Sequence, residues 1–289
     1  MTTYTTAATP SGHKIDPRPI KVDLEQAPRY WFDQHPFKTF FHNALITTFP
    51  AGENFFVRSV AHFRNQVMDK QLQQQINAFI SQEGNHANAH DLHCDILERQ
   101  GFRTIKFENK LIDRALKRMN RRMPKFALAT TVALEHFTAM LAHLGFERED
   151  VLGNRMDPQF AALLRWHAAE EIEHKAVAFD VYQTVDGSYW RRAIAMAMAT
   201  FSLTFLVPLR VIPLLWVDGY LFNGRQWKEG LAFLYGREGL FVLPLRHYLE
   251  FYRRDFHPWQ IQDYHMIERF TTQEYQPDGT VRLPAAMSA

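Results

Sequence analysis

The sequence predicts an all-α protein, a four-helix bundle with additional C-terminal hydrophobic helices. Three observations support this fold class. Glycine and proline are scarce, at 13 and 14 in 289 residues, whereas a many-stranded sandwich would need more turn residues. Apolar residues repeat at spacings of three and four along several long segments, which is the period of an α-helix. Two Glu-x-x-His motifs fall within these segments, where about 0.8 would arise by chance, and each would place both side chains on one helical face.

Composition excludes several classes of protein. The net charge of +2 gives no argument for nucleic-acid binding. The single cysteine, Cys94, excludes an internal disulfide framework, and we expect it to be a small buried residue rather than a catalytic thiol. The first thirty residues lack a continuous apolar segment of the kind found in secretory signals, so we expect a cytoplasmic protein.

The two ends of the chain lack helical patterns. Residues 1–35 contain four prolines and are expected to form an extended arm over the domain, with no visible chemistry. Residues 257–289 are expected to form a C-terminal tail, with a turn at 276–279 followed by loose polypeptide to residue 289.

The predicted bundle occupies residues 36–188, and its first strong helix spans residues 51–68. Thr48 can cap this helix, and Pro50 fits its first turn, where a missing N–H costs little. Glu53 lies one turn before Phe56, the first residue of an apolar stripe. A carboxylate is therefore expected among core residues.

The second helix is predicted over residues 69–100, with Gly101 as its stop. Glu83, His86 and His90 lie on it at i, i+3 and i+7. A charged connecting helix follows over residues 106–122. For its basic run a solvated face is favoured over a contact with phosphate or anionic lipid.

The third and fourth helices are predicted over residues 124–146 and 157–186. Glu135 is the only acid in the apolar centre of the third helix, so its carboxylate is expected to point inward. On the fourth, His167, Glu171 and His174 share one face at i, i+4 and i+7.

Residues 189–256 form the predicted hydrophobic helical extension. Residues 193–209 carry no charge, but this run is too short for a simple transmembrane helix and is broken at Pro208. Basic and aromatic residues flank it, as is typical of segments at the headgroup region of a bilayer. Three roles stay open for this extension: peripheral membrane contact, a second helical layer on the bundle, and a homodimer contact.

The four helices together offer Glu, Glu-x-x-His, Glu and Glu-x-x-His, in that order. Ferritin-like bundles hold two metal ions with this set. Four carboxylates buried without a counter-charge would cost several kcal/mol each, a cost that divalent cations remove. We therefore expect a dinuclear centre, with iron as the first choice and Mn/Fe or zinc as alternatives.

Further residues border this expected centre. His167 can supply a third nitrogen ligand, with a role beside the ligands or in a substrate pocket as its alternative; His90 is a further candidate. Glu170, Glu173 and His136 flank ligands and are expected to form supporting hydrogen bonds or surface pairs.

Several segments closely resemble the bacterial family labelled "predicted metal-dependent hydrolase", a member of the ferritin-like superfamily, over residues 35–255. They are residues 49–56, 82–90, 133–138 and 166–180. The spacing of His167, Glu171 and His174 is also similar to the arylamine N-oxygenases, di-iron enzymes with an additional histidine. That resemblance implies seven ligands: Glu53, Glu83, His86, Glu135, His167, Glu171 and His174.

Three functions are weighed. The favoured one is a non-haem di-iron oxidase or oxygenase that uses dioxygen and an electron donor on a hydrophobic or small organic substrate, with the four glutamates as catalytic ligands. The first alternative is a hydrolase that uses a metal-bound water. The second alternative is a non-catalytic metal-binding or storage protein. The apolar extension suggests a lipid-like substrate reached from the inner membrane.

Overall fold

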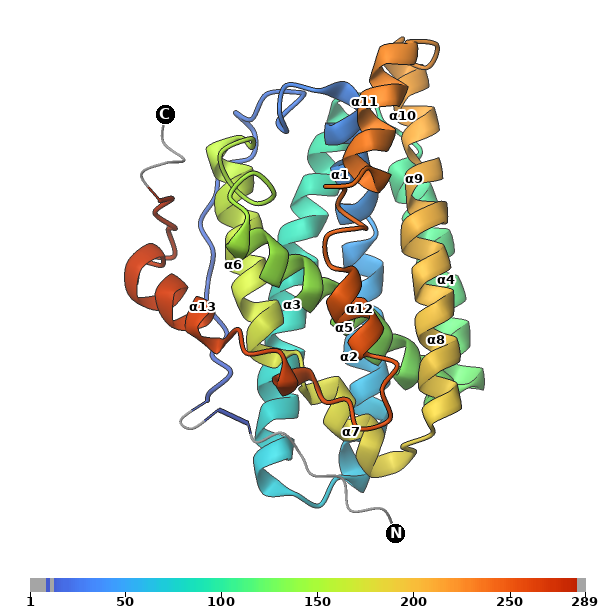
Figure 1. The fold of residues 1–289 in the computed structure, drawn as a ribbon, viewed down its shortest axis with the longest axis vertical. Coiled ribbons are helices and arrows are strands. Elements are labelled where there is room, and N and C mark those ends of the chain that lie inside the picture. Colours follow the sequence, from blue (N-terminus) through green and yellow to red (C-terminus); the bar gives the residue numbers. More distant parts are fainter. Residues whose placement is uncertain (1–8, 11–12, 285–289) are drawn as a thin grey trace.

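The structure, a computed structural model, describes residues 9–10 and 13–284 of the chain. These residues form helices and isolated β-bridges but no strand, which confirms the all-α prediction for this part of the chain. Figure 1 shows the long helices side by side, with short helices and extended segments around them. The α-helices are α1 (Pro36–Ile46), α2 (Phe49–Phe63), α3 (Lys70–Arg99), α4 (Ile105–Arg122), α5 (Pro124–Glu147), α6 (Pro158–His174), α7 (Val177–Val185), α8 (Tyr189–Phe201), α9 (Val207–Leu209), α10 (Val211–Val217), α11 (Gly224–Tyr235), α12 (Leu245–Glu250) and α13 (Tyr264–Arg269).

Helices α2, α3, α5 and α6 are the four that carry the predicted ligands. Helix α2 packs against α3 and α5, and α6 packs against α5 and α3. Helix α3 begins after Asp69, whose side chain accepts from the backbone N–H of Leu72, and Gly101 at φ 102° follows its end. Pro50 lies in the first turn of α2 as expected. Thr48, however, makes no side-chain cap, because its hydroxyl donates to the carbonyl of Leu45.

The helices differ from the prediction at several places: α2 ends at Phe63 instead of residue 68, and two larger differences follow. Helix α1 was not expected; it begins with Pro36 after His35, whose side chain accepts from Lys38 N–H. The helix expected over residues 157–186 is broken after His174 into α6 and α7. No glycine or proline marks this break. The buried Lys175 there donates to the carbonyl of Ile261 and to Asp263, so a contact distant in sequence accompanies the change of direction.

Both ends of the described chain pack on the bundle. Residues 13–35 contain no helix and run along one side of the molecule (Figure 1). Helix α13 packs against α6, and the buried Arg165 donates twice to Glu274, at 2.7 and 2.6 Å. The turn expected at 276–279 is closed by a bridge between Tyr275 and Val281. The loose end expected at residues 285–289, and residues 1–8 and 11–12 of the arm, lie outside the described residues.

Helices α8, α9 and α10, joined by a π-helical turn (Ser202–Leu206), form an outer rod beside the bundle (Figure 1). The rod packs on the bundle mainly through α8, which lies against α5. Among the described residues, this stretch, Tyr189–Val217, is long and apolar enough to cross a membrane. Arg210, at the end of α9, donates to Glu108 of α4 at 2.9 Å and so ties the rod to that helix.

Candidate metal centre

The seven predicted ligands converge from four helices in the middle of the bundle. Glu53 comes from α2, Glu83 and His86 from α3, Glu135 from α5, and the remaining three from α6. All seven side chains are buried. Their ligand atoms form two adjoining groups, each with its atoms within 4.8 Å of one another: Glu53, His86 and His167 in the first group, and Glu83, Glu135, Glu171 and His174 in the second.

The first group joins α2, α3 and α6. Nε2 of His167 lies 2.8 Å from Oε1 of Glu171 and 3.7 Å from Oε1 of Glu53. Nε2 of His90 lies 2.8 Å from Nδ1 of His167 and 3.7 Å from the same Glu53 oxygen. His90 therefore contacts the His167 ring at Nδ1, the ring nitrogen that does not face Glu171 and Glu53. It also borders the first group, in line with its position at i+7 from Glu83 on the same helix.

The second group is organised around His174. Its Nε2 lies 3.1 Å from Glu83 Oε1, 3.4 Å from Glu135 Oε2 and 3.6 Å from Glu171 Oε1. Nδ1 of His86 lies 3.4 Å from that Glu171 oxygen, so Glu171 stands between the two groups. Glu171 would thus be placed to contribute carboxylate oxygens to cations held by either group.

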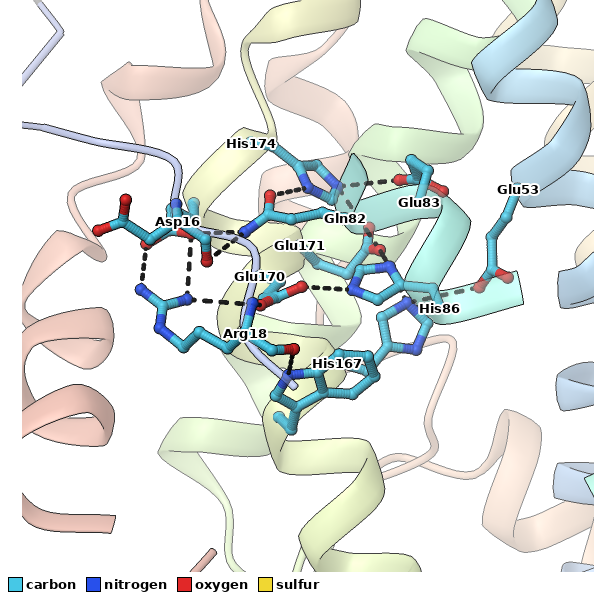
Figure 2. Close-up of polar contacts among 12 residues, drawn as sticks. Asp16, Arg18, Glu53, Gln82, Glu83, His86, His167, Glu170, Glu171 and His174 are labelled. Carbon is cyan, nitrogen blue, oxygen red and sulfur yellow. Dashed lines mark hydrogen bonds and ion pairs between the residues drawn. The ribbon is translucent and has the colours of Figure 1, made fainter. Parts of the chain in front are cut away.

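A ring of polar contacts supports the histidines from outside (Figure 2). Nε2 of His86 lies 3.0 Å from Glu170, and Nδ1 of His174 lies 2.9 Å from Oε1 of Gln82. Arg18 of the N-terminal arm donates to Glu173 at 2.7 Å, and its backbone N–H donates to Glu170 at 2.9 Å. The expectation of supporting bonds from Glu170 and Glu173 agrees with these contacts, and the arm, in which no chemistry is visible from the sequence, contributes Arg18 to them.

Sequence reasoning missed Arg18 and Gln82. A weak signal existed for Gln82, because it directly precedes the ligand Glu83. Arg18 lies 155 residues from Glu173 in sequence, and no local pattern marks such a pair. His136 lies away from the centre, since its Nε2 faces the backbone carbonyl of His247 at 3.0 Å. Cys94 is buried, and burial raises the pKa of its thiol to about 12, as suits an unreactive residue.

Buried polar atoms without partners test whether this donor set fits metal ions. Both carboxylate oxygens of Glu53, Glu83 and Glu135 lack a hydrogen bond to any described residue. The same holds for Oε2 of Glu171, and for one nitrogen each of His86 and His174 that faces the centre. Buried polar groups in native proteins are otherwise almost always satisfied. The residues therefore fit a pair of cations, which would satisfy these atoms together.

The electrostatics of this donor set are unfavourable in a way that a bound cation would relieve. Burial raises the pKa of Glu53 and Glu135 well above the usual range, and it also raises the pKa of Glu83. Burial acts in the same direction on Glu171, but the neighbouring His174 and His167 bring its pKa well below the usual value. Burial lowers the pKa of His86, but Glu170 and Glu171 outweigh it and raise that pKa to about 10. Without metal, protons must provide the missing positive charge.

Two apolar pockets open onto one side of this centre. Both reach His167 and Glu171, and one of them also reaches Glu53. Their walls share Leu45, Phe49, Thr138 and Leu141. The hydroxyl of Thr138 donates to the carbonyl of Glu135, so it is not free for a ligand. The opposite side of the centre, formed by Gln82, Glu83, His86 and His174, is fully buried under the arm.

The comparisons with known proteins agree with a metal-dependent enzyme. The family model for "predicted metal-dependent hydrolase" matches residues 16–262, which is most of the chain. The chain belongs to this family. No curated protein and no solved structure matches it significantly. The family description and the buried His/Glu groups together indicate that metal ions are part of its function.

This family membership corrects the reaction expected from the sequence. A dioxygen-activating di-iron oxidase or oxygenase was favoured, because carboxylate-rich four-helix centres commonly serve redox chemistry. The family match instead supports the hydrolytic alternative, so the favoured expectation was wrong. The error arose because the donor set alone does not distinguish redox from hydrolytic use of a dinuclear centre.

Proposed function

We propose that this protein is a hydrolase that uses two divalent cations and cleaves a substrate with an apolar acyl group. The observation that carries the proposal is the convergence, beside apolar pockets, of seven buried side chains, six of which have at least one polar atom without a hydrogen bond to any described residue. The proposed ligands are those of the two groups: Glu53, Glu83, His86, Glu135, His167, Glu171 and His174. When bound, the cations would lower the pKa of a water molecule and stabilise negative charge on substrate oxygen.

We further propose that α2, α3, α5 and α6 form a ferritin-like bundle. The order of the ligands along the chain and their arrangement in space support this assignment. His167 is the position at which the ligand set is similar to that of the arylamine N-oxygenases, and we propose that the likeness is limited to ligand positions. A donor set rich in carboxylates with imidazoles suits Fe(II), Mn(II) or Zn(II).

The protein's own residues would bind and orient the substrate. Leu45, Phe49 and Leu141 offer an apolar wall to the acyl group and exclude water from it. An acyl group held there would present its carbonyl to Glu53, His167 and Glu171, the ionisable side chains among the described residues that line this pocket. His90 is the positioning residue for His167, because its ring nitrogen fixes the orientation of the His167 imidazole.

The test is hydrolysis of p-nitrophenyl esters of increasing acyl length. Protein stripped of metal and reloaded with Zn(II), Mn(II) or Fe(II) should cleave the longer esters with the higher kcat/KM. Glu171→Gln should abolish cleavage and lower metal content, because Glu171 stands between the two groups. Glu268→Gln, at an exposed position on α13, is the matched control and should change neither. Full activity in the metal-stripped protein, or in Glu171→Gln, would refute the proposal.

A further inference from the structure

The outer side of the α8–α10 rod carries a continuous apolar stripe. Its side chains recur at spacings of three and four over the whole rod, and each is between 38% and 67% exposed. A stripe of this length on a water-facing helix marks an interaction surface. Its members are Trp190, Ile194, Met198, Phe201, Phe205, Leu209, Ile212 and Trp216.

The rod is fixed flat against the bundle by its other side. Ala195, Met196 and Ala199 are buried where α8 packs on α5, and Val211 and Leu215 are buried further along the rod. A helix held along its length in this way presents only one face to a partner. The stripe therefore suits a surface that lies parallel to the rod, and a tryptophan stands at each end of it.

Helix α4 adds positive charge beside the stripe. An ion pair connects the two elements, with Arg210 at 2.9 Å from Glu108. Helix α4 and the rod lie at the same edge of the molecule (Figure 1). Several cations on the exposed side of α4 have no ion-pair partner among the described residues: Lys110, Arg114, Arg118, Arg121 and Arg122. Phe107 and Leu111 are exposed between them.

We propose that the face formed by the apolar stripe and this basic row docks on an anionic phospholipid bilayer. The stripe enters the boundary between headgroups and acyl chains, and the cations of α4 contact the phosphates. A second copy of the chain fits less well, because in a two-fold dimer the same patch meets itself, and the patch offers no acidic side chain to the basic row. The bilayer surface in this proposal is the cytoplasmic leaflet of a membrane, whose lipids carry negative charge. This proposal is independent of the hydrolytic reaction.

The test is sedimentation of the full-length protein with vesicles. Vesicles of equal parts phosphatidylcholine and phosphatidylglycerol should bind the protein at low salt at least about tenfold more strongly than phosphatidylcholine alone, and high salt should weaken binding. Phe201→Ser/Phe205→Ser should abolish binding to either vesicle. Lys110→Glu/Arg114→Glu should remove the preference for anionic vesicles.

Two matched controls keep the test specific. Lys14→Glu/Lys21→Glu makes the same charge change on the arm, at the opposite edge of the molecule, and should bind as the unmodified protein does. Met68→Ser changes another highly exposed apolar residue and should also have no effect. Equal binding to both vesicle types, or full binding by Phe201→Ser/Phe205→Ser, would overturn the proposal. The proposal would also be overturned if the unmodified protein formed a dimer and did not bind vesicles, and if Phe201→Ser/Phe205→Ser dissociated that dimer.

Discussion

Oε1 of Gln82 lies 2.9 Å from Nδ1 of His174, while the amide nitrogen of Gln82 donates to Glu173 at 2.6 Å. Because the amide nitrogen faces a carboxylate, Oε1 is the acceptor, and Nδ1 of His174 carries the hydrogen. Nε2 of His174 is then directed at Glu83, Glu135 and Glu171. Gln82 thus selects the nitrogen that His174 offers to a cation.

Replacing Gln82 by leucine should therefore weaken metal binding without unfolding the protein. Loss of a supporting hydrogen bond to a ligating histidine typically costs about 10- to 100-fold in metal affinity. Competition with a chelator measures that affinity. Gln74→Leu, at an exposed position of the same helix, is the control. Equal affinities for the two variants would mean that the Gln82 contact does not orient His174.

The buried carboxylate of Glu135 should matter for metal content, in contrast to an exposed acid on the same helix. Glu135→Gln should bind fewer metal ions per chain and lose the rise in Tm that metal gives to the unmodified protein. Without metal, Glu135→Gln should be at least as stable as the unmodified protein, because a buried acid whose oxygens have no hydrogen bond to any described residue has been removed. Glu147→Gln should match the unmodified protein in both tests. Elemental analysis measures the number of metal ions per chain, and thermal melts measure Tm with and without metal.

The metal-free protein should lose stability as pH rises from about 7 to about 9. His86 has a pKa raised to about 10, so in this window the folded state holds a proton on His86 that the unfolded state has lost, and the raised pKa values of Glu53, Glu83 and Glu135 act in the same direction. The lowered pKa values of His90 and His167 act mainly below about pH 7.5, because an unfolded imidazole is about nine-tenths neutral at that pH. Urea titrations across the range give the free energy of unfolding. With metal bound, this loss should disappear, since cations replace the protons.

Arg18→Ala should destabilise the protein by about 3 kcal/mol, because it leaves the buried carboxylate of Glu173 without its cation and removes one of the two cationic contacts of Glu170. Denaturant unfolding of the metal-free protein measures this change. Arg253→Ala removes an exposed arginine paired with Asp255 and should leave the unfolding midpoint unchanged. A midpoint for Arg18→Ala that equals that of the control would show that the arm is not anchored by this pair.

Filling the pocket should alter substrate preference without touching the metal. Leu141 lines both pockets beside the centre and a third one next to α8. Leu141→Trp should lower kcat/KM for esters of long acyl chains more than for acetyl esters, with unchanged metal content. An equal loss for both ester lengths would place the acyl group elsewhere.

The side chains that converge in the bundle could be predicted from sequence, because each is marked by a local pattern. Glu83 with His86, and His167 with Glu171 and His174, share a helical face by spacing alone, and Glu53 and Glu135 are isolated acids within apolar helices. The centre then follows from the packing of four amphipathic helices. Arg18 lay beyond this reasoning, because an extended arm has no periodicity that reveals what it contacts.

The break after His174 was also beyond prediction. Lys175 carries no signal for a helix end, and its partner Asp263 lies 88 residues later. The reaction type was missed for another reason: the donors are the same for several chemistries, and only the family match separated them.

The uneven enclosure of the centre has a consequence for how it is loaded. Gln82, His86 and His174 are sealed beneath the arm, whereas Glu53, His167 and Glu171 border the pockets. We therefore expect the proposed ions and substrate to reach the centre from the same side, through these pockets. A long-chain inhibitor bound in the pockets should then slow the loss of metal to a chelator.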